Sequence, residues 1–341
     1  MVEPEHRHVH FVGSIALDTV DDVFETCGRV LGGRLKRIPD GEPGGRRLWI
    51  NWQLPLLRAS PYLMIDPSVP AGSLALSPLM LREGVRPEEV AFGELGYSRE
   101  ARASYLDFIA ARERGAIAPG VRFQVSLPTP FAVIWPFVIG DGVQHVLAAY
   151  DRAMLEEVNR ISAAIPHEDL AFQWDICVEM LVWDGQPSII PSVPNKEQVI
   201  PPMLARLIDA VPERVQVGFH LCYGDFDGRH FVEPKDAARM TSLANAIVDA
   251  ASRPVNWVHM PVPRERDDDK YFVPLADLRL GPDTDLYLGL VHDDGAEATR
   301  RRVEAAEKYA PQFGIATECG IARLRTPAQV REMIEIHRDT L

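Results

Sequence analysis

A histidine and a cysteine stand two residues apart in an apolar segment of this sequence, at His220 and Cys222. If that segment is a strand, both side chains project from the same face. An imidazole and a thiolate placed in this way can share one metal ion, and Zn²⁺ favours such nitrogen and sulfur donors. His259 and Cys319 end two other apolar segments. The sequence therefore predicts a zinc site formed by His220, Cys222, His259 and Cys319.

The remaining two cysteines are predicted to be structural. Cys27 falls in a helical pattern and Cys177 ends a strand-like segment. Four cysteines in a chain of 341 residues do not make a disulfide framework.

Short β-rich segments alternate with amphipathic helical ones along most of the chain. The predicted strands are His8–Ile15, Leu35–Asp40, Val121–Leu127, Leu170–Ile176, Val215–Leu221, Val255–Met260, Asp285–Val291 and Gly314–Glu318. The predicted helices are Thr19–Leu31, Gly142–Ile165, Lys196–Ala210, Pro234–Ala251, Ala296–Tyr309 and Pro327–Arg338. Eight strands with helices between them predict an α/β fold, a (β/α)8 TIM barrel, with a doubly wound sheet as the alternative.

Active sites of such barrels lie at the carboxyl ends of the strands. Reactive side chains stand at these ends here: Ser14, Asp40, Glu42, Asp175, Cys177, His220, Cys222, His259, His292, Asp293 and Cys319. One active site at that end of the barrel is therefore predicted.

The connection between the second and third predicted strands is unusually long, about eighty residues over Gly41–Gly120. It contains a helical pattern near Arg99–Arg114. We expect a single barrel domain over residues 1–341, with residues 41–120 inserted as a lid or side wall.

Composition excludes several classes of protein. The net charge is −13, from 49 acidic and 36 basic residues, which is the wrong sign for a nucleic-acid binder. Apolar runs such as Phe131–Ile139 are too short to cross a membrane. The first residues are polar and unlike a secretory signal, so a cytoplasmic protein is expected. Neither glycine-rich phosphate-binding motif is present, so no nucleotide cofactor is expected.

Two segments resemble the C-terminal catalytic barrel of the cobalamin-independent methionine synthase family, within the superfamily of uroporphyrinogen decarboxylase. VGFHLCYGDF is similar to the family's metal-binding strand, with its His-x-Cys pair, and TECGIAR to its later Cys-Gly. The resemblance is looser elsewhere along the chain. It implies a zinc enzyme, in the size range of the short forms that take methyl groups from donors other than folate.

The resemblance also implies roles for individual residues. FVGSIAL is similar to the family's opening strand, so Ser14 would contact an amino-acid substrate. Glu42 would hold the substrate amine, and Asp175 matches a substrate-binding aspartate. His292 corresponds to a histidine on the family's catalytic loop, so His292 or Asp293 would move the proton.

One expected ligand departs from the family pattern. The family has a glutamate at the end of the sixth strand, where this sequence has His259, with Glu265 as a nearby alternative. Two thiolates and two imidazoles would leave Zn²⁺ formally neutral. Such a metal should be a better Lewis acid, and a thiolate bound to it a weaker nucleophile.

The expected function is zinc-dependent transfer of a methyl or alkyl group to a small thiol, with Zn²⁺ as cofactor. Neither nucleic acid nor membrane is an expected partner, and a homodimer would be usual for a barrel of this size. Six tryptophans offer an alternative: if those near strand ends, such as Trp174, line the pocket, the substrate is aromatic. An O-demethylase, a hydrolase or a carbon–carbon lyase would then fit. A metal-free decarboxylase using Arg46 and Arg47, or a non-catalytic binding barrel, also stays open.

Overall fold

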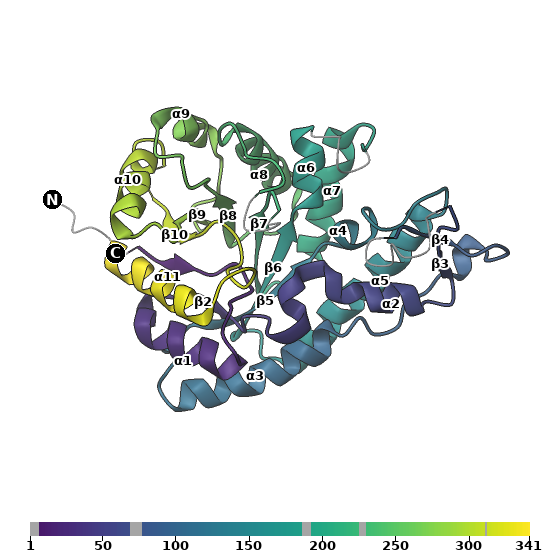
Figure 1. Cartoon of the computed structure of the whole chain (residues 1–341), viewed down its shortest axis with the longest axis horizontal. Coiled ribbons are helices and arrows are strands. Elements are labelled where there is room, and N and C mark those ends of the chain that lie inside the picture. Colours follow the sequence, from purple (N-terminus) through teal and green to yellow (C-terminus); the bar gives the residue numbers. More distant parts are fainter. Residues whose placement is uncertain (1–6, 69–76, 186–191, 225–229, 311) are drawn as a thin grey trace.

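The chain folds around one closed sheet. A computed structural model describes residues 7–68, 77–185, 192–224, 230–310 and 312–341. Its main sheet has eight strands, each parallel to its neighbours, in the order β1-β10-β9-β8-β7-β6-β5-β2. A parallel bridge between Val9 and Leu35 joins the two outer strands of that order. The predicted (β/α)8 barrel is therefore confirmed (Figure 1).

The barrel strands lie close to their predicted positions. They are β1 (Val9–His10), β2 (Arg37–Pro39), β5 (Arg122–Pro128), β6 (Leu170–Ile176), β7 (Gln216–Leu221), β8 (Trp257–Pro261), β9 (Asp285–Val291) and β10 (Gly314–Thr317). The first strand is much shorter than predicted, because beyond His10 only isolated bridges at Ser14 and Ile15 continue it.

Helices surround the barrel in Figure 1. They are α1 (Val20–Leu31), α3 (Tyr97–Glu113), α4 (Pro130–Ile134), α5 (Val143–Ala164), α6 (Val178–Asp184), α7 (Lys196–Asp209), α8 (Ala238–Ala250), α9 (Asp269–Phe272), α10 (Ala296–Glu307) and α11 (Pro327–Thr340). Several start where the sequence favours it: the Thr19 and Thr326 side chains accept hydrogen bonds from the first turns of α1 and α11. Within the described residues, none of the helices combines the length and the apolar character needed to cross a bilayer.

A column of polar side chains runs through the barrel interior toward the carboxyl ends of the strands. The buried Arg37 guanidinium lies over the Trp257 ring, 4.1 Å from its centre, and pairs with Asp285 at 2.8 Å. Above it, Gln173 lies 2.7 Å from the His10 imidazole and donates to Asp175. Most polar atoms of these buried groups have hydrogen-bond partners, as a closed interior requires. They fix the position of Asp175 at the strand end.

The long connection between β2 and β5 contains one helix of the outer ring and an added segment. Its helix α3 packs against α1, α5 and β5, so it belongs to the barrel's outer ring. The added part comprises a 3-10 segment (Gly44–Gln53), α2 (Leu54–Ala59) and the antiparallel strands β3 (Leu63–Ile65) and β4 (Leu79–Leu81). Residues 69–76 of the connection lie outside the described part of the chain. Figure 1 shows α2, β3 and β4 to the right of the barrel.

A glycine in α1 sets how closely this helix approaches the end of α3. A Cβ atom at Gly28 would lie 2.2 Å from the backbone oxygen of Ala116, whereas nothing lies within 4 Å of a Cβ at Gly33. We expect Gly28→Ala to lower the free energy of unfolding by about 2–3 kcal/mol, although alanine is the better helix former. Gly33→Ala is the control and should change it by less than about 0.5 kcal/mol in urea denaturation. Equal stability of the two variants would contradict this packing.

Candidate metal centre

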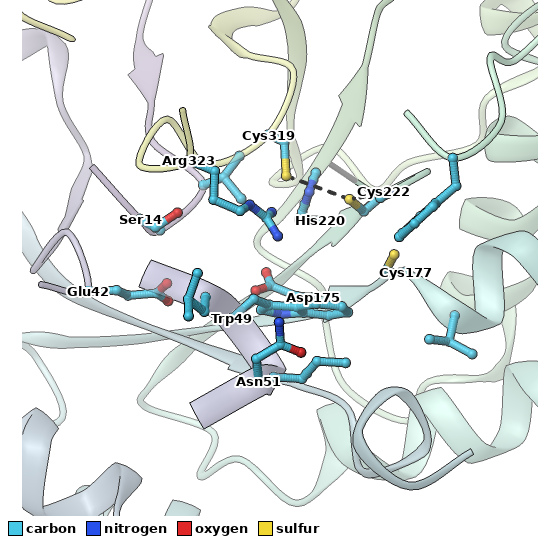
Figure 2. Close-up of a pocket in the computed structure, with 18 of the residues that line it drawn as sticks. Ser14, Glu42, Trp49, Asn51, Asp175, Cys177, His220, Cys222, Cys319 and Arg323 are labelled. Atoms are coloured by element: carbon cyan, nitrogen blue, oxygen red, sulfur yellow. Dashed lines mark hydrogen bonds between the residues drawn. The ribbon is translucent and has the colours of Figure 1, made fainter. Parts of the chain in front are cut away.

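A cavity of about 410 Å³ opens at the carboxyl ends of the barrel strands, where the strand-end residues predicted the site. Its lining combines thiols, an imidazole, two carboxylates, an arginine and apolar side chains (Figure 2). The polar and thiol members include Ser14, Glu42, Asn51, Asp175, Cys177, His220, Cys222, Cys319 and Arg323.

Three of the four predicted metal ligands meet at this cavity. Donor atoms of His220, Cys222 and Cys319 all lie within 4.8 Å of one another, and all three residues are buried. The Cys222 and Cys319 sulfur atoms are 3.7 Å apart. Two thiolates on a tetrahedral Zn²⁺, with Zn–S bonds of about 2.3 Å, stand about 3.8 Å apart. The spacing of the two sulfur atoms therefore fits two ligands of one zinc ion.

The hydrogen bonds around His220 leave one of its ring nitrogens able to bind a metal ion. The His259 Nε2 atom lies 3.0 Å from the Thr317 carbonyl oxygen, which can only accept, so Nε2 carries the proton. Burial lowers the pKa of His259 to about 3, so the ring is neutral and its Nδ1 accepts from the His220 Nδ1–H at 2.6 Å. His220 Nε2 then bears a lone pair, and within the described structure this buried atom has no hydrogen-bond partner. A metal ion would supply that partner.

His259 itself is therefore not a ligand in this structure, and the prediction must be corrected. Its two ring nitrogens contact His220 and Thr317. His259 therefore supports the ligand His220 and does not join the thiols in the donor cluster. Strand register explains this position, because His220 and His259 are direct neighbours on β7 and β8. The alternative, Glu265, is exposed on the loop after β8 and is absent from the donor cluster. The cluster thus has three protein donors among the described residues.

Cys177 lies in the cavity although its sequence position indicated only a structural thiol. It lines the cavity at the end of β6, and its thiol is within hydrogen-bonding reach of the Cys222 sulfur. Cys27, by contrast, is fully buried in α1, where burial raises the pKa of its thiol. A purely structural role thus fits Cys27, whereas Cys177 lies in the cavity, at the strand end where the sequence placed it.

Two carboxylates face the cavity from neighbouring parts of the barrel. Burial, with the nearby Asp175 and Asp40 carboxylates, raises the pKa of Glu42 to about 8. Burial also raises the pKa of Asp175 to about 7, against the hydrogen bond donated by Gln173. The positive charge of Arg323 opposes both shifts. These pKa values favour a bound cation or donor group, which would lower them again.

The raised pKa values predict how stability of the metal-free protein changes with pH. A carboxyl whose folded pKa lies above its unfolded value stabilises the fold at low pH, and this contribution is lost as pH rises through the folded value. Glu42→Gln cannot ionise, so it should be more stable than wild type at pH 8.5, by about 2 kcal/mol. The two should be nearly equal at pH 4.5. Urea denaturation measures this, with the exposed Glu94→Gln as control, and a difference that grows toward acid pH would contradict it.

The opening segment brings Ser14 to the cavity. The Ser14 carbonyl accepts from the Ile321 N–H at 2.7 Å, and a Cβ at Gly320 would lie 2.2 Å from the Ser14 hydroxyl oxygen. Only a glycine after Cys319 allows this approach. The Cys-Gly pair therefore joins the metal cluster to the predicted substrate-binding loop.

Apolar side chains form the opposite side of the cavity. They come from the insertion after β2, the segment after β5, the start of α6 and the segment after β7: Leu48, Trp49, Ile50, Pro136, Phe137, Val178, Leu181 and Phe231. Trp49 has a positive φ of 53°, which is unusual for a large side chain. Within the predicted insertion, Glu42 and residues 48–51 reach the cavity.

Several predicted site residues do not line the cavity. Trp174 is buried on β6, where alternation turns it outward from the barrel axis while Gln173 and Asp175 point inward, so its predicted role in substrate binding must be corrected. His292 is buried with Nε2 donating to the Val262 carbonyl, and Asp293 pairs with Arg264. Neither is among the residues that form the cavity wall.

The arginines of the decarboxylase alternative are also engaged elsewhere. Arg46 pairs with Asp40 at 2.8 Å, and Arg47 donates to the Leu17 carbonyl oxygen. Neither lines the cavity. Arg323 lines the cavity but was not among the predicted site residues, although it follows Cys319 by four residues. The rule that placed Cys319 at a strand end could have found it.

Comparisons with known proteins agree with the fold. No protein-family model matches the sequence, and no curated protein matches it. Among solved structures, a putative vitamin-B12 independent methionine synthase from Listeria monocytogenes superposes with a TM-score of 0.60 at 13% identity, over 100% of this chain and 99% of that one. A B12-independent methionine synthase from Shewanella, in complex with selenomethionine, gives 0.49 at 14% identity, over 77% and 69% of the two chains. The Listeria structure thus shares the barrel fold of this chain over the whole length of both.

Proposed function

We propose that this protein is a zinc-dependent enzyme that transfers a methyl or alkyl group to the sulfur of a small thiol. The observation that carries the proposal is the cluster of His220, Cys222 and Cys319 at the wall of the cavity. Three protein donors leave the fourth position of tetrahedral zinc open, which is the arrangement of catalytic zinc sites.

Zinc held there would lower the pKa of a coordinated substrate thiol, so that its sulfur becomes a nucleophilic thiolate. The protein residues supply what this reaction also needs. In the balanced reaction the carbon–sulfur bond forms as the bond from carbon to the donor's leaving group breaks, and the thiol proton must be taken up.

Asp175 is the residue best placed to accept that proton. It pairs in register with His220 on the next strand, lines the cavity, and has a pKa of about 7, near the value that suits a general base at neutral pH. His292 and Asp293, for which the sequence suggested this role, do not line the cavity.

The charged groups of the cavity suit a substrate with an amine. Glu42 would bind an ammonium group, which stabilises its ionised form, and Arg323 would pair with a carboxylate. Ser14 lies beside the metal cluster and would add a hydrogen bond. An amino-acid-like thiol fits this arrangement.

The apolar side of the cavity favours a particular kind of alkyl donor. Trp49, Phe137 and Phe231 bring three aromatic rings to it. A donor with a flat or extended apolar part, such as an aromatic methyl ether, would bury that surface. Demethylation of such an ether with a thiol as acceptor is therefore the second candidate, and it uses the same metal cluster.

A thiol-alkylation assay tests the proposal. Zinc-loaded protein is incubated with a methyl donor and, in parallel, with an aminothiol carboxylate, a simple aminothiol and a thiol carboxylate, and thioethers are measured by mass spectrometry. We expect the two thiols with an amine to react faster than the thiol carboxylate, and Glu42→Gln to reduce that preference. Absence of any thioether, over a panel that includes aromatic methyl ethers and with one zinc bound per chain, would overturn the proposal.

A further inference from the structure

Cys177 and Cys222 directly follow the paired ends of two neighbouring parallel strands, β6 and β7. Ile176 pairs with Leu221, and the Cys222 N–H donates to the Ile176 carbonyl at 2.9 Å, so the two cysteines start from adjacent backbone positions. Neighbouring strands lie about 4.8 Å apart. That spacing falls inside the range of about 4.4–6.8 Å between the Cα atoms of disulfide-bonded cysteines.

The two side chains also meet in an accessible place. Both line the cavity (Figure 2). The Cys177 thiol is in hydrogen-bonding reach of the Cys222 sulfur. The Gly224 N–H points at the Cys222 sulfur, at 3.2 Å. A small oxidant can reach the pair through the cavity.

Cys319 is a second neighbour of Cys222, but nothing in the sheet aligns their backbones. Two strands, β8 and β9, separate β7 from β10, which precedes Cys319. Their sulfur spacing of 3.7 Å fits two ligands of one metal ion. Cys222 therefore has one partner suited to sharing a metal and another, Cys177, suited to a disulfide.

We propose that Cys177 and Cys222 form a reversible disulfide on exposure to a peroxide, and that this oxidation releases the metal. The Cys222 thiolate attacks a peroxide oxygen and becomes a sulfenic acid, and Cys177 then displaces water from it. Two thiols lose two protons and two electrons, and hydrogen peroxide is reduced to two waters. The disulfide needs no metal, whereas the metal release rests on the proposed function.

Thiol counting and peptide mapping test this inference on the full chain. Metal-free wild type treated with hydrogen peroxide should lose two of its four thiols, yield a Cys177–Cys222 cross-linked peptide and recover four thiols with dithiothreitol. Cys177→Ala should give no disulfide, whereas the matched variant Cys319→Ala should still give it. Zinc-loaded wild type should release its zinc to a chromogenic chelator as the disulfide forms.

Two results would overturn the inference: a Cys222–Cys319 disulfide in wild type, or a full count of four thiols after treatment. Zinc retained after the Cys177–Cys222 disulfide has formed would overturn the release step. Failure of the proposed function would show differently, as reduced wild-type protein that binds no zinc before any oxidant is added. The thiol count does not depend on that result.

Discussion

Cys222→Ala should bind almost no zinc and should lose nearly all thiol-alkylating activity. The variant lacks one of the three protein donors for the metal. Without bound zinc, the thiolate of the substrate and the transition state of its alkylation are not stabilised. That stabilisation is worth several kcal/mol, so the rate should fall by roughly 10³-fold or more. Elemental analysis of purified, zinc-reconstituted protein gives the stoichiometry, and thioether formation gives the rate.

Cys27→Ala is the matched control for this experiment. Cys27 is also a buried cysteine, but it lies in α1 away from the cavity. It should retain one zinc per chain and the wild-type rate. If Cys222→Ala, shown to be folded by circular dichroism, still binds one zinc per chain, the assignment of the cluster is wrong.

His259→Leu should weaken zinc binding without abolishing it. The substitution removes the acceptor that holds the proton of His220 on Nδ1 and thereby directs the Nε2 lone pair into the cluster. Loss of such a supporting hydrogen bond usually reduces metal affinity by about 10–100-fold. Competition against a chromogenic chelator measures the zinc dissociation constant, and His259→Gln, which keeps an acceptor, should recover part of the loss.

The same measurement separates the orienting role of His259 from two other roles. A direct ligand would make His259→Leu as deficient in zinc as Cys222→Ala. An imidazole that only fills space would leave the affinity unchanged. Either result would contradict the orienting role that the hydrogen bonds indicate.

Much of the fold follows from local sequence pattern. The predicted strands Leu170–Ile176 and Asp285–Val291 have the bounds observed for β6 and β9. Strands of a parallel barrel are buried on both faces, so they read as apolar runs bounded by polar residues. The β3–β4 ribbon and the short helices α4 and α6 carried no such signal. Elements this short form through packing against the rest of the structure.

The site was predictable as far as strand ends determine it. His220, Cys222 and Cys319 were placed together because parallel strands bring their carboxyl ends to one edge. Which of two alternate side chains points inward depends on register, and this is where Trp174 was misplaced. The role of His259 depends on which neighbouring imidazole it meets, and the contact of Cys177 with Cys222 depends on strand pairing. Neither can be read from spacing along one chain.

Zinc K-edge X-ray absorption of the zinc-loaded protein, with and without an aminothiol, tests the central claim most directly. The account predicts two sulfur ligands and one imidazole nitrogen in the free protein, and a third sulfur after the thiol is added. A sulfur count that does not change with the thiol would contradict activation of a substrate thiol at this cluster. Three or more sulfur ligands before any thiol is added would contradict the open fourth position.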